Sequence, residues 1–334
     1  MKIDKLAEFL KKEKVPAYRL KQIKEAYFKQ NLGSFNDISS LPLSLREKLT
    51  KNFSWLNIKP EKTLGSKKEG AVKAALTLED GLKIESVLMF YRNWNTACLS
   101  VMVGCPLGCE FCATGQMGFK RNLTDYEITD QIVFWNRFLN EKGGRVGKVV
   151  FMGMGEPFLN WENTFQAIKT INSKDGLNIG QRNITVSTAG IPGKIKEFAD
   201  LETQINLAIS LHSPFQEKRE EIMPSAKKNT LGELMASAEY YVKKTNRKLF
   251  FEYALIKNIN DRKEDALEIA KLFRNKLFHL NLINLNPTGS KHYAALPKNI
   301  AEFTKILDQK YIPYTIRRSV GASIQAACGQ LAAK

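Results

Sequence analysis

The chain has 334 residues, of which 43% are hydrophobic and 25% charged, which fits one large α/β domain plus a small accessory domain and excludes a disordered chain. No apolar run approaches the roughly 20 residues that cross a bilayer and no apolar export segment opens the chain, so we expect a soluble, cytoplasmic protein with no membrane partner. Lys and Arg outnumber Asp and Glu by 51 to 34, a net charge of +17, which favours a polyanionic partner such as nucleic acid.

The N-terminal segment is predicted to form a small basic helical module. Apolar residues recur at helical spacing over 3–12 and 16–30, and a third short helix is predicted over 44–52. Residues 1–70 carry 16 basic and 8 acidic side chains, about half of the net excess in a fifth of the chain. We therefore expect residues 1–60 to be an accessory RNA-binding domain, with a merely solvated basic surface as the alternative.

The next segment predicts a linker and a β-hairpin. Residues 60–70 are rich in Lys, Glu and Gly, a composition typical of linkers. Two stretches of alternating hydrophobicity, 71–78 and 82–90, are separated by an Asp-Gly pair, which is a strong hairpin signal. Residues 61–95 are therefore expected to join the helical module to the main domain.

From residue 96 to residue 334, short apolar strands alternate with helical segments. The predicted strands are 97–103, 148–152, 183–187, 205–211, 249–256, 280–285 and 314–317. One helix start is marked by a capping box from Thr124 to Glu127. Repeated βα units indicate a parallel sheet with helices outside it, either open or curled into a barrel. In a barrel, the chemistry lies in the loops after the strand carboxyl ends.

Three of the five cysteines form a compact cluster. Cys105, Cys109 and Cys112 have the spacing C-x3-C-x2-C directly after the first predicted strand of the main domain. Three thiolates can ligate three irons of a [4Fe–4S] cube and leave the fourth iron open. A structural zinc site takes four ligands, and no His lies near the cluster in sequence. The pattern favours an iron–sulfur enzyme, with a zinc-containing RNA-binding protein as the non-enzymatic alternative.

This spacing, with Phe111 before the last cysteine, resembles the signature of the radical S-adenosylmethionine (SAM) superfamily. The resemblance implies that the open iron of a [4Fe–4S] cluster binds the cofactor through its amino and carboxylate groups, and that an electron then releases a 5′-deoxyadenosyl radical. Gly155 and Glu156, which follow the strand predicted at 148–152, match the motif that holds the methionine ammonium. The expected fold is therefore a partial, TIM-like (β/α)6 barrel.

Further stretches resemble one branch, the RlmN/Cfr family of RNA adenine methyltransferases, and most closely its carbon-2 enzymes. They are Cys112-Ala113-Thr114-Gly115, Arg121-Asn122-Leu123-Thr124, Ser187-Thr188-Ala189-Gly190-Ile191-Pro192, Ser210-Leu211-His212-Ser213-Pro214, Asn286-Pro287 and Ala326-Ala327-Cys328-Gly329-Gln330-Leu331. The resemblance covers nearly the whole chain, including the basic N-terminal helices. It implies that Ser187, Ser210, Leu211, His212 and Asn286 bind the cofactor.

The family mechanism gives roles to the two remaining cysteines. It implies that one S-adenosylmethionine methylates Cys328, and that the radical from a second molecule removes hydrogen from this S-methyl group. The carbon radical then adds to carbon 2 of adenine, and Glu85 matches the general base that removes the ring proton. Attack of Cys98 on the Cys328 sulfur forms a disulfide and releases the methylated RNA.

The resemblance implies adenine 2503 of 23S rRNA as the substrate, adenine 37 of tRNA as a second candidate, and an electron donor such as flavodoxin or ferredoxin. Carbon-8 methylation of the same rRNA adenine, the reaction of the antibiotic-resistance branch, is the alternative activity; Pro157 favours carbon 2. A radical enzyme acting on a protein or small molecule is a further alternative, which the basic excess disfavours. The chain departs from the family pattern at 100–102 and 322–325, which leaves all five thiols intact but bears on substrate fit.

Overall fold

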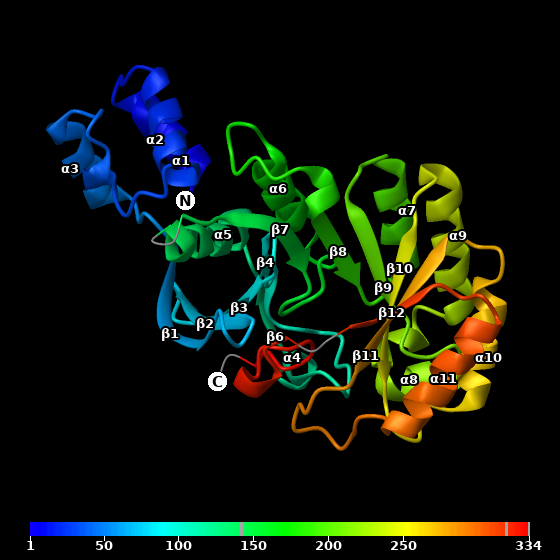
Figure 1. The fold of residues 1–334 in the computed structure, drawn as a ribbon. Helices are drawn as coiled ribbons and strands as arrows, with labels where there is room; N and C mark the ends of the chain where they lie inside the picture. Colours follow the sequence, from blue (N-terminus) through cyan, green and yellow to red (C-terminus); the bar gives the residue numbers. More distant parts are fainter. Residues whose placement is uncertain (141–142, 318–319, 333–334) are drawn as a thin grey trace.

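A computed structural model describes residues 1–140, 143–317 and 320–332 (Figure 1). Its strands are β1 (Ile58–Ser66), β2 (Ala71–Leu78), β3 (Lys83–Phe90), β4 (Asn95–Cys98), β5 (Met102–Gly104), β6 (Phe119–Asn122), β7 (Val146–Phe151), β8 (Ile184–Thr188), β9 (Asn206–Ser210), β10 (Leu249–Leu255), β11 (Phe278–Asn284) and β12 (Tyr314–Arg317). Its helices are α1 (Ile3–Lys12), α2 (Tyr18–Phe28), α3 (Leu43–Asn52), α4 (Ala113–Gln116), α5 (Asp125–Asn140), α6 (Trp161–Asn172), α7 (Pro192–Asp200), α8 (Gln216–Ile222), α9 (Leu231–Thr245), α10 (Lys263–Phe273) and α11 (Pro297–Gln309).

Ten strands form one sheet in the order β1-β2-β3-β4-β7-β8-β9-β10-β11-β12. Pairing is antiparallel from β1 to β4 and parallel from β4 to β12. Each parallel strand from β4 to β11 is followed by a crossover that contains a helix, and α5, α6, α7, α9, α10 and α11 cover the outside of the curved sheet (Figure 1). Among the described residues β1 and β12 do not pair, so the barrel is open. The predicted partial (β/α)6 barrel is confirmed.

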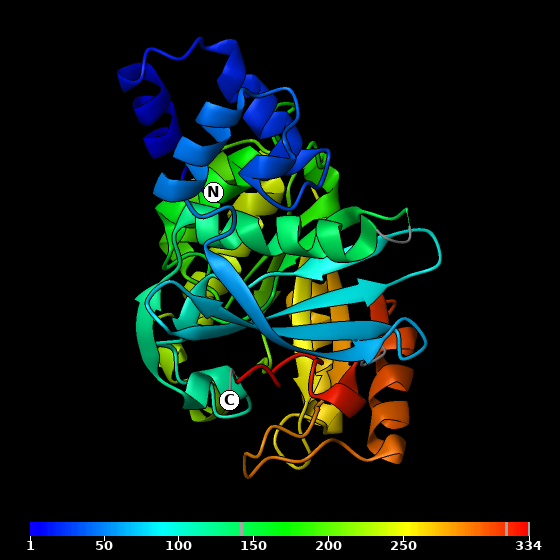
Figure 2. The same ribbon diagram turned by 90° about the vertical axis from the view of Figure 1, so that its left-hand side faces the viewer.

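The three predicted N-terminal helices are also confirmed and stand above α5, outside the barrel (Figures 1 and 2). Leu6, Ile23 and Leu49 are fully buried, so the module has its own apolar contacts. The carboxylate of Asp130 on α5 accepts hydrogen bonds from the backbone and side-chain N–H groups of Asn57, at 2.7 and 2.8 Å, and from the Tyr27 hydroxyl. This buried polar cluster joins the helical module to the barrel.

Over the described residues, no helix is long and apolar enough to cross a bilayer.

The linker predicted over 60–70 is wrong for its first half. Residues 58–66 form β1, which pairs with β2 from Ile58↔Leu78 to Ser66↔Ala71. Nearly all its side chains are exposed, because β1 is the edge of the sheet and its polar residues face water. The hydrophobic alternation that identified the next two strands is therefore absent here, although the backbone is paired.

The single strand predicted over 97–103 is also wrong, because the structure divides it into β4 and β5. β4 belongs to the main sheet, whereas β5 pairs with β6 in a separate two-stranded sheet. Between them the hydroxyl of Ser100 donates to the backbone oxygen of Glu85 at 2.6 Å and accepts from the backbone N–H of Met154 at 2.9 Å. These contacts direct the chain out of the main sheet and toward the cysteine loop.

The C-terminal segment returns to the same end of the barrel as the cysteine loop and lies beside α4 (Figure 2). The backbone N–H of Ala113 donates to the oxygen of Gly329 at 2.8 Å, and the Thr114 hydroxyl donates to the oxygen of Leu331 at 2.6 Å. Gln330 donates to the backbone oxygen of Pro287 at 2.9 Å. These bonds fix Cys328 opposite the cysteine loop, more than 200 residues away in sequence.

Candidate active site

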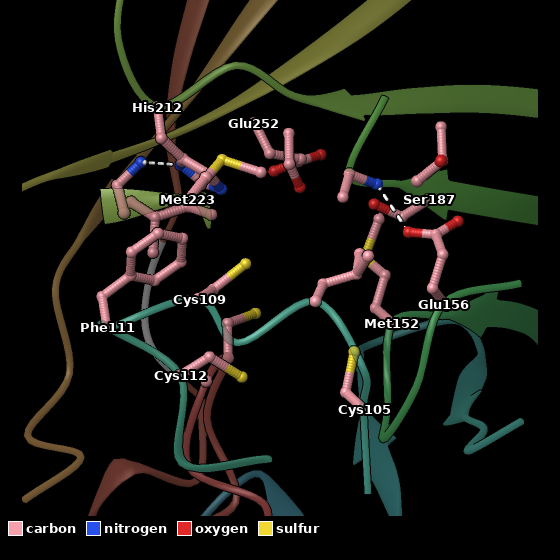
Figure 3. A pocket seen from close by; sticks show the side chains of 18 of the residues that line it. Cys105, Cys109, Phe111, Cys112, Met152, Glu156, Ser187, His212, Met223 and Glu252 are labelled. Carbon is pink, nitrogen blue, oxygen red and sulfur yellow. Dashed lines mark hydrogen bonds between the residues drawn. The ribbon is translucent and has the colours of Figure 1, made fainter. Parts of the chain in front are cut away.

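A cavity of about 180 Å³ opens between the cysteine loop and the carboxyl ends of the parallel strands (Figure 3). The predicted residues in its wall are Cys105, Cys109, Cys112, Gly155, Glu156, Ser187, Ser210, His212, Asn286 and Cys328. Leu211 is not among the lining residues: its side chain is fully buried in the core, and its backbone N–H donates to the oxygen of Glu252 at 3.0 Å. The structure thus gathers the expected cluster and cofactor residues, with Leu211 behind them.

The side chains of Cys105, Cys109 and Cys112 point into this cavity from one loop (Figure 3). The loop starts at Gly104, whose φ is +75° and where a Cβ would lie 1.8 Å from the oxygen of Gly118, so only glycine fits. Within the described residues no three Cys, His, Asp or Glu side chains converge on a point that could hold one metal ion. In a cubane each thiolate takes a separate iron, so three thiolates on one loop suit such a cluster without converging on a single point.

Two of the three thiols, those of Cys105 and Cys109, are poor anions until a cation neutralises them. Burial raises the pKa of Cys105 to about 12 and raises that of Cys109 further. Since only the thiolate ligates metal, binding must release protons from this loop. The residues therefore fit an iron–sulfur cluster whose assembly depends on pH.

Glu156 provides a buried carboxylate beside the cysteines. Its Oε2 accepts a hydrogen bond from the backbone N–H of Ala189 at 2.7 Å, and its Oε1 accepts one from Phe158 at 3.0 Å. Burial raises the pKa of Glu156 to about 6, although these donors act in the opposite direction. The neighbouring Gly155 has φ +102°, and a Cβ there would lie 2.6 Å from the Cβ of Met102. The carboxylate is therefore rigidly held and suited to bind an ammonium group.

His212 is a neutral ring with a fixed orientation. Burial lowers its pKa to about 3, and the nearby charge of Arg219 lowers it as well. Its Nδ1 accepts a hydrogen bond from the backbone N–H of Ala254 at 2.9 Å (Figure 3), so its proton is on Nε2. Phe111 packs against the ring edge-on, with 4.7 Å between the ring centroids. His212 therefore offers one oriented N–H donor without a charge.

Cys98 and Cys328 both line a second, larger cleft of about 1080 Å³. Cys328 also lines the small cavity, so this residue lies at the boundary between the two. Burial raises the pKa of both thiols, that of Cys98 to about 12, and the positive charge of Arg317 lowers both. The side chain of Asn286 donates to the backbone oxygen of Cys328 at 3.2 Å. Both cysteines are free thiols in this structure.

Glu85 is not among the residues lining either the cavity or the cleft. Its Oε1 forms an ion pair with Nζ of Lys73 at 2.8 Å, with both side chains less than a tenth exposed. Its Oε2 accepts a hydrogen bond from the backbone N–H of Ala332 at 2.8 Å. The carboxylate thus lies under the C-terminal segment that carries Cys328, and that segment separates it from both spaces.

Sequence reasoning missed two charged residues near the cavity. The first is Glu252 on β10, which lines the cavity. The side chain of Asn281 donates a hydrogen bond to Oε1 of Glu252 at 2.9 Å. Oε2 of Glu252 is buried and has no hydrogen-bond partner within the described part of the chain. Arg219 on α8 is fully buried and donates to the backbone oxygens of Ala189 at 2.7 Å and Ser210 at 3.3 Å, which joins the ends of β8 and β9. Glu252 could have been found from the sequence, because it is an acid within the otherwise apolar β10. No feature of the sequence pointed to Arg219.

Comparisons with known proteins agree with this geometry. The family model of the radical SAM superfamily matches residues 99–272. The chain is 44% identical to a probable dual-specificity RNA methyltransferase RlmN of Dictyoglomus thermophilum, covering 99% of this chain and 95% of the relative. It is also 44% identical to the one of Clostridioides difficile, covering 99% and 96%.

The fold gives the same result. A crystal structure of a radical SAM methyltransferase from Sphaerobacter thermophilus superimposes with a TM-score of 0.96 at 39% identity, and the match covers 100% of this chain and 98% of that one. Both the sequence relatives and this structure match from the N-terminal helices through the C-terminal segment. The chain therefore belongs to the radical SAM superfamily and, within it, to the RlmN family of RNA methyltransferases.

Proposed function

We propose that this protein methylates carbon 2 of adenine 2503 in 23S rRNA, and adenine 37 of tRNA as a second substrate. The observation that carries the proposal is the place of Cys328, which lines both the cavity of the clustered cysteines and the large cleft. A methyl carrier needs access to both cofactor and substrate. The RNA methyltransferases among the relatives support RNA as that substrate.

When bound, a [4Fe–4S] cluster and S-adenosylmethionine supply a methyl group and a 5′-deoxyadenosyl radical, with two cofactor molecules used for each transfer. Cys105, Cys109 and Cys112 hold the cluster. Glu156 binds the methionine ammonium. Its buried carboxylate follows the end of β7 and lines the same cavity as the three cysteines. The remaining cofactor contacts come from Gly155, Ser187, Ser210, His212 and Asn286 in the wall and from the backbone of Leu211 behind it.

The chain's own residues then handle the methyl group and the proton. Cys328 accepts the methyl group as a thiolate, which the nearby charge of Arg317 favours. Glu85 removes the proton from carbon 2 once the C-terminal segment has uncovered its carboxylate. Cys98 shares the cleft with Cys328, and its attack on that sulfur forms a disulfide and frees the RNA.

Residues 1–60 are proposed as the accessory RNA-binding domain, 61–95 as the connection and 96–334 as the catalytic domain. The basic excess of the N-terminal module supports contact with phosphates. A small reducing protein such as flavodoxin or ferredoxin delivers the electron. Ribosomal RNA as substrate places the enzyme in the cytoplasm.

The test is nucleoside analysis of 23S rRNA and tRNA by mass spectrometry after expression in a host that lacks its own enzyme. We expect 2-methyladenosine in 23S rRNA, and its presence or absence in tRNA decides the second substrate. The Cys328→Ala variant is the matched control and should yield none. Finding 8-methyladenosine without 2-methyladenosine would replace the proposal by the carbon-8 reaction, and finding neither would refute RNA methylation.

A further inference from the structure

The large cleft extends well beyond the two thiols. Cys98 ends β4, and Trp94, just before the start of β4, lines the same cleft. Because a strand rises about 3.3 Å per residue, these two positions lie about 13 Å apart. The cleft's volume of about 1080 Å³ lies just above the range of about 300–1,000 Å³ that is typical of ligand pockets. The space therefore exceeds what one adenine base beside Cys328 requires.

Two exposed aromatic rings lie in the turn between β3 and β4. The side chains of Tyr91 and Trp94 are 44% and 40% exposed, and their rings stack with centroids 5.9 Å apart and planes 30° apart. The backbone N–H of Tyr91 donates to the oxygen of Trp94 at 3.0 Å, which closes the turn. Nζ of Lys148 lies 3.7 Å from the centre of the Trp94 ring. The aromatic surface of this closed turn and the cation of Lys148 on β7 thus lie side by side.

The two rings are connected to the reacting end of the cleft. Burial raises the pKa of the Tyr91 hydroxyl, the charge of Arg317 lowers it, and the thiols of Cys328 and Cys98 raise it. Tyr91 and Trp94 line the same cleft as the thiols of Cys98 and Cys328. A chain of bases entering at Cys328 would pass over these rings.

The charge of the cleft favours an anionic chain. Among the described residues, the charged ones that line it are Lys68, Lys148, Arg182 and Arg317, against one acid, Glu69. Proteins that bind single-stranded nucleic acid combine such a basic groove with aromatic side chains on which bases stack. An aromatic turn in an uncharged groove would fit an apolar ligand instead.

We propose that Tyr91, Trp94 and Lys148 form a platform for the nucleotide next to the target adenine, with its base stacked on the aromatic pair and its phosphate beside Lys148. The inference rests on the proposed function, because it requires an unpaired adenine at Cys328. The platform would contribute to specificity, because the enzyme binds well only when the flanking nucleotide is unpaired and able to stack. A target adenine whose neighbour is held in a duplex is then a poor substrate.

The test uses the holoenzyme, kept free of oxygen, and a transcribed 23S rRNA fragment that contains adenine 2503. We expect Trp94→Ala to raise the Kd for this RNA and the KM by about 5- to 150-fold, the range that alanine substitution of a base-stacking aromatic gives. Trp94→Phe should retain most of the affinity. Tyr240→Ala is the matched control, since Tyr240 is an exposed aromatic on α9 outside the cleft, and it should bind and methylate as the wild type does.

A second measurement keeps the wild-type protein intact and changes the RNA. Replacing the nucleotide on one side of adenine 2503 by an abasic residue should weaken wild-type binding by a similar factor. The same RNA should bind Trp94→Ala no worse than the unmodified fragment does, because the lost interaction is the same one. Binding should also quench the fluorescence of wild-type protein more than that of Trp94→Phe, since Trp94 is the exposed tryptophan among the described residues.

The outcomes separate this inference from the proposed function. If wild-type enzyme methylates the fragment while Trp94→Ala keeps its KM within twofold, and neither abasic position weakens binding, the platform is wrong and the proposed function stands. If the wild-type enzyme neither binds nor methylates the fragment, both fall. If Trp94→Ala fails to fold, the abasic RNAs on wild-type protein decide alone.

Discussion

The buried ion pair between Lys73 and Glu85 allows stability and catalysis to be separated at one position. Its atoms are 2.8 Å apart, and the side chains are 8% and 7% exposed. Removing one partner of such a pair costs about 3–5 kcal/mol, because a charge is left buried without its counterion. Glu85→Gln should therefore lower the free energy of unfolding by this amount, while Gln still accepts the hydrogen bond from Ala332.

The double variant Lys73→Met/Glu85→Gln removes both charges and should recover at least half of that loss. Urea unfolding followed by circular dichroism, with the cluster in the same state throughout, measures each variant. Lys83→Met is the control on the same strand, because its ion pair with Glu61 at 2.8 Å is 42% exposed on both sides and its loss should leave the midpoint nearly unchanged. A loss below about 1 kcal/mol for Glu85→Gln would refute a buried pair there.

The same double variant tests the proposed role of Glu85 in catalysis. The urea measurement on this variant establishes how much of it is folded, so that a loss of activity can be separated from instability. We expect it to methylate Cys328 but to form no 2-methyladenosine, since no carboxylate removes the ring proton. Normal yields of 2-methyladenosine would show that the base is another group and that Glu85 serves only the ion pair.

Three further predictions concern the thiols and the cofactor. Cys98→Ala should accumulate a covalent adduct between protein and RNA, visible on a denaturing gel, and a clean release of product would exclude its resolving role. Arg317→Met should raise the pKa of Cys328 and move the pH profile of Cys328 methylation to higher pH, because the thiolate is the nucleophile; Arg317→Lys should restore it, and an unmoved profile would count against the charge effect. Binding of S-adenosylmethionine, followed by anaerobic calorimetry, should weaken as pH falls through about 6, where Glu156 takes up a proton and loses its charge; Glu156→Gln should bind weakly at every pH, and a flat wild-type profile would argue against a carboxylate–ammonium contact.

Much of the fold could be predicted from the sequence, because buried parallel strands appear there as short hydrophobic segments. β10 and β11 are almost wholly buried, so their hydrophobic residues were easily recognised. β1 lacks such an apolar run. It pairs with β2 along one edge only, and nearly all its side chains are exposed to water on both faces. The division of 97–103 into β4 and β5 depends on Ser100, whose contacts with Glu85 and Met154 exist only in the folded chain.

The same distinction holds for the site: residues close together in sequence could be predicted, whereas contacts between distant segments could not. Spacing alone predicted the cysteine loop, because its three thiolates are neighbours in sequence. The contacts of Glu85 could not be predicted, since an acid in an alternating strand is expected to face water, and here the C-terminal segment covers it. Arg219 binds backbone oxygens of two different strand ends, a role that leaves no pattern in the sequence.

The central claim is that a methyl group passes through Cys328 by radical chemistry at the open corner of a three-cysteine cluster. The direct measurement supplies S-adenosylmethionine with a fully deuterated methyl group to reconstituted enzyme and RNA, and follows deuterium by mass spectrometry. We expect 5′-deoxyadenosine to gain one deuterium and the methyl group on carbon 2 of adenine to retain two. Transfer of all three deuterium atoms to the RNA, with no labelled 5′-deoxyadenosine, would contradict it.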